Sequence, residues 1–115
     1  MSEKEMVLEQ SRQTNDEFVA LSQFTVAEGM EDSVKDAFMN RPHLVDNAPG
    51  FIRMDVLRPT TCPQEFWLMT WWKDECSYET WHQSHAYHES HKQMPKGLKL
   101  VPGSAKITKL GLLSR

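Results

Sequence analysis

The segment at residues 65–72, Glu-Phe-Trp-Leu-Met-Thr-Trp-Trp, carries large apolar side chains at both odd and even positions. In a β-strand, successive side chains point to opposite faces of the sheet. The alternation divides the large residues into two sets: Phe66, Leu68 and Trp72 on one face, and Trp67, Met69 and Trp71 on the other. A sheet covered by helices on one side only has no use for apolar residues on its second face. The segment therefore predicts a sheet that is covered on both faces.

Three further segments carry strand signals. Residues 18–26 alternate in the same way, which places five side chains on one face: Phe18, Ala20, Ser22, Phe24 and Val26. Residues 51–58 form an apolar-rich run that is separated from residues 65–72 by six residues containing two prolines, a spacing that is typical of an antiparallel hairpin. A last strand is expected at about residues 105–113.

Two helices are expected between these strands. The first begins at the acidic residues 31–32, where negative charge suits a helix N-terminus. Pro42 lacks a backbone N–H, so this helix either stops near Arg41 or continues past a kink. The second helix begins at Asp74 and continues through Trp81. Tyr78 lies about one turn before Trp81, on the same face of the helix.

The predicted order is strand, helix, strand, strand, helix, strand. This order specifies an α+β fold, a ferredoxin-like sandwich in which both helices pack on one face of an antiparallel sheet. The open face then needs a partner, and a second copy of the chain related by a two-fold axis would cover it. We therefore expect a homodimer, built from a domain at residues 17–115 that follows a flexible arm at residues 1–16.

Composition narrows the possible partners. Of the 115 residues, the part up to His91 contains seven Lys or Arg and sixteen Asp or Glu, whereas the remainder contains six Lys or Arg and no acid. Such an acidic body argues against nucleic acid as a partner. The basic tail suits either a small anionic ligand or a solvated surface. No apolar run reaches the length of a membrane helix, and two cysteines without paired spacing indicate a reduced, cytoplasmic protein.

Four of the five histidines recur every third residue at positions 82, 85, 88 and 91. Steps of three residues spread the imidazoles around a helix, whereas a zinc site prefers histidines four residues apart. Only His85 and Glu89 form a ligand-capable pair with that spacing. The spacing therefore disfavours a dedicated zinc site, and most of these histidines are expected on the surface.

Within the same segment, Trp81, Ser84, Tyr87 and His91 follow a pattern that resembles the haem-degrading monooxygenases of the antibiotic biosynthesis monooxygenase superfamily. The resemblance extends over about residues 17–113. It includes three weaker motifs: Leu57-Arg58-Pro59, Pro49-Gly50-Phe51, and the pair Thr70 and Trp72. Members of that superfamily form dimeric α+β barrels, which agrees with the fold expected from the strand pattern.

The resemblance implies a cofactor and roles for particular residues. His91 would be the proximal ligand of a haem iron, and Trp81 would press on the porphyrin face and ruffle it. The enzyme would open the ring with O₂ and an external electron donor and release iron, so that haem is both cofactor and substrate. Phe38 and Arg41, with His43, would line the same pocket. The basic tail, through Lys92, Lys96 and Lys99, would neutralise the propionates.

This assignment requires a break in the second helix. An unbroken helix would separate Trp81 from His91 by about 15 Å, which is too far for one porphyrin. Ser84 is a favourable N-cap residue, and we therefore expect the break there.

One position departs from the superfamily. Its first strand carries an Asn whose amide contacts the distal ligand of the iron, and this chain has Ser22 there. Gln23 points to the opposite face and does not replace the amide. The shorter hydroxyl predicts slow turnover. Two alternatives stay open: a cofactor-independent monooxygenase acting on a small aromatic substrate, and a dimeric binding protein without catalysis.

Overall fold

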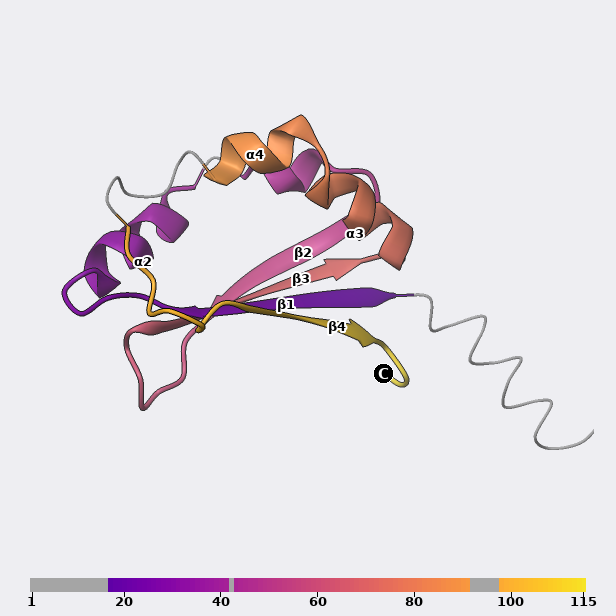
Figure 1. Cartoon of the computed structure of the whole chain (residues 1–115). Coiled ribbons are helices and arrows are strands. Elements are labelled where there is room, and N and C mark those ends of the chain that lie inside the picture. The colour runs from indigo at the N-terminus through magenta and orange to yellow at the C-terminus, as the bar shows by residue number, and fades with distance from the viewer. Residues whose placement is uncertain (1–16, 42, 92–97) are drawn as a thin grey trace, which may run out of the picture.

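The computed structural model describes residues 17–41, 43–91 and 98–115, with only the backbone described at residues 90–91. Its four strands are β1 (Phe18–Thr25), β2 (Phe51–Leu57), β3 (Glu65–Trp72) and β4 (Lys106–Gly111). They form one antiparallel sheet in the order β2-β3-β1-β4 (Figure 1). This arrangement confirms the predicted ferredoxin-like fold. The arm expected at residues 1–16 lies outside the described residues.

All helical segments lie on one face of this sheet (Figure 1). They are α2 (Glu31–Met39), the 3-10 turn η1 (Leu44–Asn47), α3 (Glu75–His82) and α4 (His85–His91). Of the two expectations for the first helix, the stop near Arg41 is confirmed. The helix ends at Met39, and Asn40 closes its last turn. The backbone N–H and the side-chain amide of Asn40 both donate to the carbonyl of Asp36, at 3.0 and 2.9 Å. Leu44 belongs to a separate turn rather than to a kinked extension of α2.

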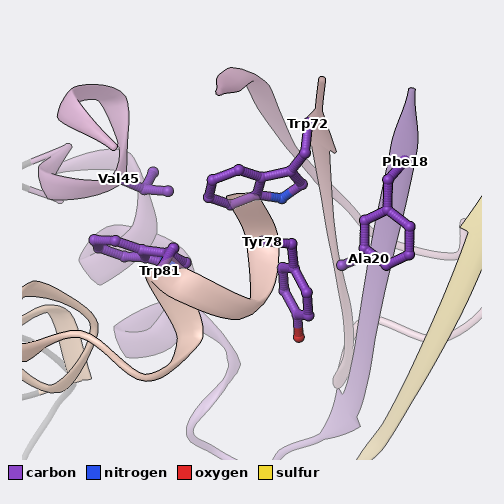
Figure 2. Packing of buried hydrophobic residues seen from close by; sticks show 6 residues of the cluster. All are labelled: Phe18, Ala20, Val45, Trp72, Tyr78 and Trp81. Carbon is purple, nitrogen blue, oxygen red and sulfur yellow. The ribbon is translucent and has the colours of Figure 1, made fainter. Parts of the chain in front are cut away.

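The helix-covered face of the sheet holds two clusters of buried side chains. The Trp72 cluster, shown in Figure 2, lies under α3 and η1 and consists of Phe18, Ala20, Val45, Trp72, Tyr78 and Trp81. The Phe66 cluster lies under α2 and consists of Val26, Val34, Phe38 and Phe66. Met54 packs against both clusters. The core is therefore divided along the sheet, with one half at each end.

The other face of the sheet has no helix against it among the described residues (Figure 1). Here β3 presents Trp67, Met69 and Trp71, all of them partly exposed, as the alternation predicts. The guanidinium of Arg53 on β2 lies over the Trp71 ring, 4.4 Å from its centroid. Leu57 and Leu110 on the two edge strands are 43% and 40% exposed. We refer to this surface as the open face.

Candidate functional site

The middle of the helix-covered face lies between the two core clusters, and Ser22 is at its centre. On β1, Ser22 pairs with Leu68 of β3 and with Ile107 of β4, and side chains paired in this way share a face. Ser22 is therefore on the helix side of the sheet, as predicted. None of the three is buried, and Ile107 is 50% exposed. Leu68 packs against the Phe66 cluster, and Ser22 is partly buried. We call these three residues the floor.

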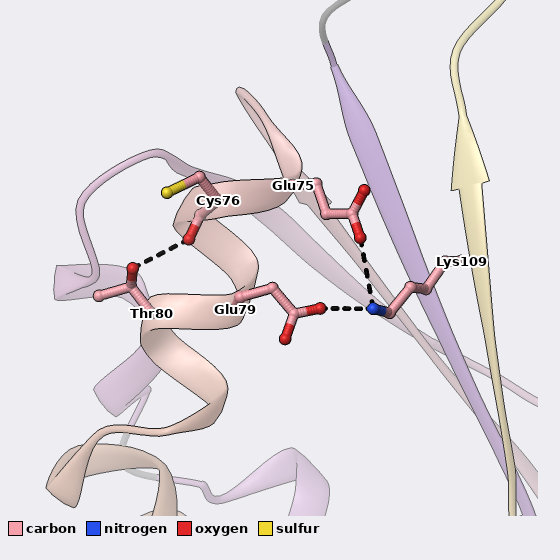
Figure 3. A network of polar contacts seen from close by, with 5 residues as sticks. All are labelled: Glu75, Cys76, Glu79, Thr80 and Lys109. Atoms are coloured by element: carbon pink, nitrogen blue, oxygen red, sulfur yellow. Dashed lines mark hydrogen bonds and ion pairs between the residues drawn. The ribbon is translucent and has the colours of Figure 1, made fainter.

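The position of α3 beside this floor is fixed by polar contacts at its start and along its side. The carboxylate of Asp74 accepts hydrogen bonds from the N–H and the hydroxyl of Ser77, at 2.8 and 2.7 Å. These hydrogen bonds hold the pKa of Asp74 below its usual value. Lys109 of β4 lies 3.3 Å from a carboxylate oxygen of Glu75 and 2.5 Å from one of Glu79 (Figure 3). The cap and the ion pairs together fasten α3 to the edge of the sheet.

The predicted helix break at Ser84 is confirmed. Its hydroxyl accepts a hydrogen bond from the N–H of Tyr87 at 3.1 Å and donates one to the carbonyl of Trp81 at 2.6 Å. The serine therefore ends one helix and caps the next. As a result α4 changes direction and stands above the sheet, packed on η1 and α3 (Figure 1).

Trp81 and His91 occupy different environments. Trp81 is 9% exposed and belongs to the Trp72 cluster, with its indole edge-on to Tyr87 at a ring-centroid distance of 6.0 Å. It is thus a core residue whose ring forms part of the wall beneath α4. His91 is the last residue of α4, and its side chain lies outside the described part of the structure.

The other histidines of this segment have local partners. His82 packs against Tyr87 with the two rings tilted, at a centroid distance of 4.5 Å, and His85 pairs with Glu89 at 3.4 Å. Burial raises the pKa of Tyr78 and of Tyr87. Within the described segments, no three His, Cys, Asp or Glu side chains are arranged to hold a metal ion.

The α2 side of the site contains Phe38 and Arg41. Phe38 is buried against Phe24 and Phe66, and its carbonyl accepts a hydrogen bond from Nη1 of Arg41 at 2.9 Å. The Nε of Arg41 is buried without a hydrogen-bond partner among the described residues. His43, in a left-handed backbone conformation, points instead to Asp46, 3.5 Å away.

The predicted residues therefore fall into two groups on either side of the floor: Trp81 with α3 and α4, and Phe38 of α2 with Arg41, which follows that helix. Lys99 is exposed, whereas Lys92 and Lys96 lie outside the described residues. The sequence interpretation gave no role to Arg58, which lines a cavity with Phe38 and Arg41. The position of Arg58 could have been predicted, because the alternation that places Val56 on the helix side of the sheet also places Arg58 there.

Comparison with known proteins gives a family match. The family model described as antibiotic biosynthesis monooxygenase matches residues 10–93. Among curated proteins, a mycobilin-producing heme oxygenase of Mycobacterium tuberculosis is 27% identical over 79 residues, which are 67% of this chain and 75% of the relative. None of the helices described here is long and apolar enough to cross a membrane.

Two solved structures illustrate the range of similar folds. MhuD from M. tuberculosis, a heme-degrader whose structure holds two hemes in its active site, superposes with a TM-score of 0.70 at 20% identity, covering 85% of this chain and 97% of MhuD. SnoaB from Streptomyces nogalater, a cofactor-independent oxygenase, superposes with a TM-score of 0.61 at 16% identity, covering 87% of this chain and 94% of SnoaB.

Proposed function

The chain belongs to the antibiotic biosynthesis monooxygenase family, and on that premise we propose that it binds haem and opens the porphyrin ring, using O₂ and an external electron donor and releasing iron. The observation that supports the proposal is the break at Ser84, where α3 ends and where α4, whose last residue is His91, begins. The similarity to the mycobacterial heme oxygenase supports the same assignment.

The residues around the floor fit a haem. Tyr87, which is only partly buried, and the accessible edges of Trp81 and Phe38, which are 9% and 7% exposed, would supply apolar surface for a flat macrocycle. The 50% exposure of Ile107 supports access from the β4 side. His91 supplies an imidazole, which is a common axial ligand of haem iron.

In this proposal each residue has a defined task. The imidazole of His91 binds the iron, and Trp81 limits how flat the macrocycle can lie. Phe38 and Arg41 would bound the pocket on the α2 side, where the positive charge of Arg41 would attract an anionic group. Bound haem supplies the redox-active iron that activates O₂. Ser22 offers one hydroxyl donor from the floor, facing away from the open side of the sheet.

A titration with ferric haem tests this assignment. The wild-type chain is expected to bind one equivalent per subunit with an imidazole-ligated visible spectrum, and His91→Ala is expected to abolish that spectrum. His82→Ala and His85→Ala serve as matched controls, because both residues have local partners on the same helical segment. Loss of the spectrum in His85→Ala or His88→Ala, but not in His91→Ala, would show that the ligand is misassigned.

The role proposed for Ser22 has its own test. A positioned donor acting on developing charge is typically worth about two to three powers of ten in rate. Ser22→Asn lengthens the reach of the donor, and it is therefore expected to accelerate single-turnover decay of the haem band under reductant and O₂, with catalase present. Decay in the wild-type chain as fast as in the variant would mean that the serine is no handicap.

Cofactor-independent oxygenation of a small aromatic substrate is the second candidate. The similarity to SnoaB and the serine at position 22 both favour it. The titration separates the two, since this candidate predicts no imidazole-ligated spectrum and O₂ consumption that depends on an added electron-rich aromatic compound.

We also propose that a second copy of the chain covers the open face. The Nε–H of Trp71 on this face is buried without a partner among the described residues, and Trp67 and Met69 on the same face are partly exposed. A two-fold interface would cover these residues and exclude water from them.

A further inference from the structure

Five aromatic side chains of β3, α3 and α4 follow one another in a continuous row of ring contacts. The row begins at Trp81, which lies edge-on to Tyr87 at a ring-centroid distance of 6.0 Å. The Tyr87 ring lies 4.5 Å from that of His82. His82 lies 5.6 Å from Tyr78, and Tyr78 lies 5.8 Å from Trp72 (Figure 2). We call these five residues the aromatic row.

The aromatic row contains both tyrosines of the chain, Tyr78 and Tyr87. Tyrosine and tryptophan are the aromatic side chains that one-electron oxidants attack most readily. Two of the four tryptophans belong to the row, whereas Trp67 and Trp71 lie on the open face of the sheet. A tyrosyl radical formed anywhere in this chain therefore resides in the row.

The oxidation of either tyrosine must release a proton. Burial raises the pKa of both phenols above the ordinary value, so both are neutral at physiological pH. His82 contacts both phenol rings and is only partly buried. An imidazole in this position can take up the phenol proton and pass it to water.

Trp72 ends the row but is a poor place for an oxidising equivalent. Its side chain is 0% exposed, and its Nε–H donates to the hydroxyl of Thr70 at 2.9 Å. A hydroxyl does not act as a base at neutral pH, so an oxidised indole would keep its positive charge inside the core, where an unpaired charge is costly. An oxidising equivalent that reaches Trp72 therefore returns to Tyr78.

We propose that the aromatic row is a relay that draws oxidising equivalents away from Trp81 and onto the two tyrosines. The proposal rests on the proposed function for the source of the oxidant, which is hydrogen peroxide reacting at bound ferric haem. Each peroxide takes up two electrons and two protons and gives two waters. The tyrosines supply both electrons and, through His82 and water, both protons, and become neutral tyrosyl radicals. An enediol reductant such as ascorbate then returns a hydrogen atom to each radical, so Trp81 is spared.

The first test needs no haem. The full-length chain carries Cys62→Ser, Cys76→Ser and His88→Cys, and a ruthenium(II) polypyridyl sensitiser is attached at position 88, where the native ring lies 5.6 Å from that of Tyr87. Flash photolysis with an irreversible electron acceptor produces a one-electron oxidant at this place. We expect a transient tyrosyl absorption, and Tyr87→Phe is expected to slow its rise at least tenfold, because the remaining tyrosine lies beyond His82. An equally fast rise in Tyr87→Phe, or no tyrosyl absorption at all, would overturn the relay.

Two further variants of the labelled chain test the path. His82→Phe keeps a ring between the two tyrosines but removes the proton acceptor, and it is expected to slow the tyrosyl rise at least fivefold. Trp67→Phe is the matched control, because it removes an oxidisable ring of the open face, and it should leave the rise unchanged. Each substitution keeps an aromatic ring, and urea midpoints verify that the fold is retained. An unchanged rise in His82→Phe, or an equal slowing in Trp67→Phe, would show that the row is not the path.

The second test adds ferric haem and hydrogen peroxide to the unlabelled chain and detects protein oxidation rather than turnover. Freeze-quench electron paramagnetic resonance should show a tyrosyl radical in the wild-type chain and none in the double variant Tyr78→Phe, Tyr87→Phe. Peptide mass spectrometry should find at least fivefold more oxidised Trp81 in the double variant. Equal oxidation of Trp81 in both chains would overturn the protective role. A chain that binds no haem would contradict the proposed function but not the photochemical result, so the two failures are distinguishable.

Discussion

Trp71 and Trp72 are consecutive residues of β3 with opposite environments. Trp72 is 0% exposed, and its Nε–H donates to the hydroxyl of Thr70 at 2.9 Å, inside a cluster completed by α3 and η1 (Figure 2). Trp71 is partly exposed, and Arg53 lies over its ring on the open face. Its Nε–H has no partner among the described residues.

The two tryptophans, one position apart, therefore have different roles. For Trp72 the chain supplies both the cover and the hydrogen-bond acceptor, so its burial contributes to the stability of one subunit. For Trp71 the chain supplies a cation above the ring and leaves the N–H unpaired. In our interpretation, Trp71 completes its contacts only in the proposed dimer.

Trp72→Ala is expected to lower the free energy of unfolding more than the other substitutions. Replacing a fully buried tryptophan leaves a cavity and costs about 3–5 kcal/mol, which is a large share of the stability of a domain of this size. Urea unfolding, followed by far-ultraviolet circular dichroism, measures the loss. An unfolding free energy within 1 kcal/mol of the wild-type value would contradict the assignment of Trp72 to the core.

Trp71→Ala is expected to act on assembly instead. Truncating a central tryptophan of an interface costs about 2 kcal/mol or more, which is roughly a 30-fold weaker dimer. Sedimentation at several protein concentrations measures the dissociation constant. A wild-type chain that is monomeric at micromolar concentration would remove the basis for the comparison, as would a Trp71→Ala dimer of unchanged affinity.

Much of this fold could be predicted from the sequence, because alternation and helical spacing are local properties. The two faces of β3, the succession of strands and helices along the chain and the break at Ser84 all follow from side-chain period and capping preference. The predicted stop of the first helix near Arg41 agrees with the observed end at Met39, where the side-chain amide of Asn40 adds a bond to the carbonyl of Asp36 that the sequence pattern does not specify.

Less of the candidate site could be predicted. Phe38 and Arg41 lie apart from Trp81 because of the way in which α2 and α3 cross the sheet. The hydrophobic period of the sequence does not determine that crossing. The contact of Lys109 with Glu75 and Glu79 (Figure 3) joins residues more than 25 positions apart. The roles of Ser22 and His91 come from the family resemblance and stay predictions.

Ser84→Ala is expected to lower the free energy of unfolding by less than Trp72→Ala does, and it acts in the half of the molecule that covers Trp72. Loss of an N-cap side chain costs about 1 kcal/mol, and here it also removes the bond to the Trp81 carbonyl. Urea unfolding measures the change, and Ser84→Asp is the matched control because it keeps an acceptor for the N–H of Tyr87. Equal losses in both variants would mean that the cap is not the cause.

The smallest effect concerns pH, because it acts through Asp74, which caps the helix that covers Trp72. The pKa of Asp74 is lowered in the folded chain, chiefly by its hydrogen bonds with Ser77. The unfolded chain therefore binds the proton more readily, so the stabilisation is fully present above the unfolded pKa and is lost as the pH falls through the lower folded pKa.

Asp74→Asn keeps an acceptor for the N–H of Ser77 but does not titrate. Urea midpoints measured between pH 3 and pH 7 should accordingly fall less steeply with acid in Asp74→Asn than in the wild-type chain, and Trp71→Ala should keep the wild-type slope. Parallel slopes for Asp74→Asn and the wild-type chain would show that this cap does not couple protonation to the cover over Trp72.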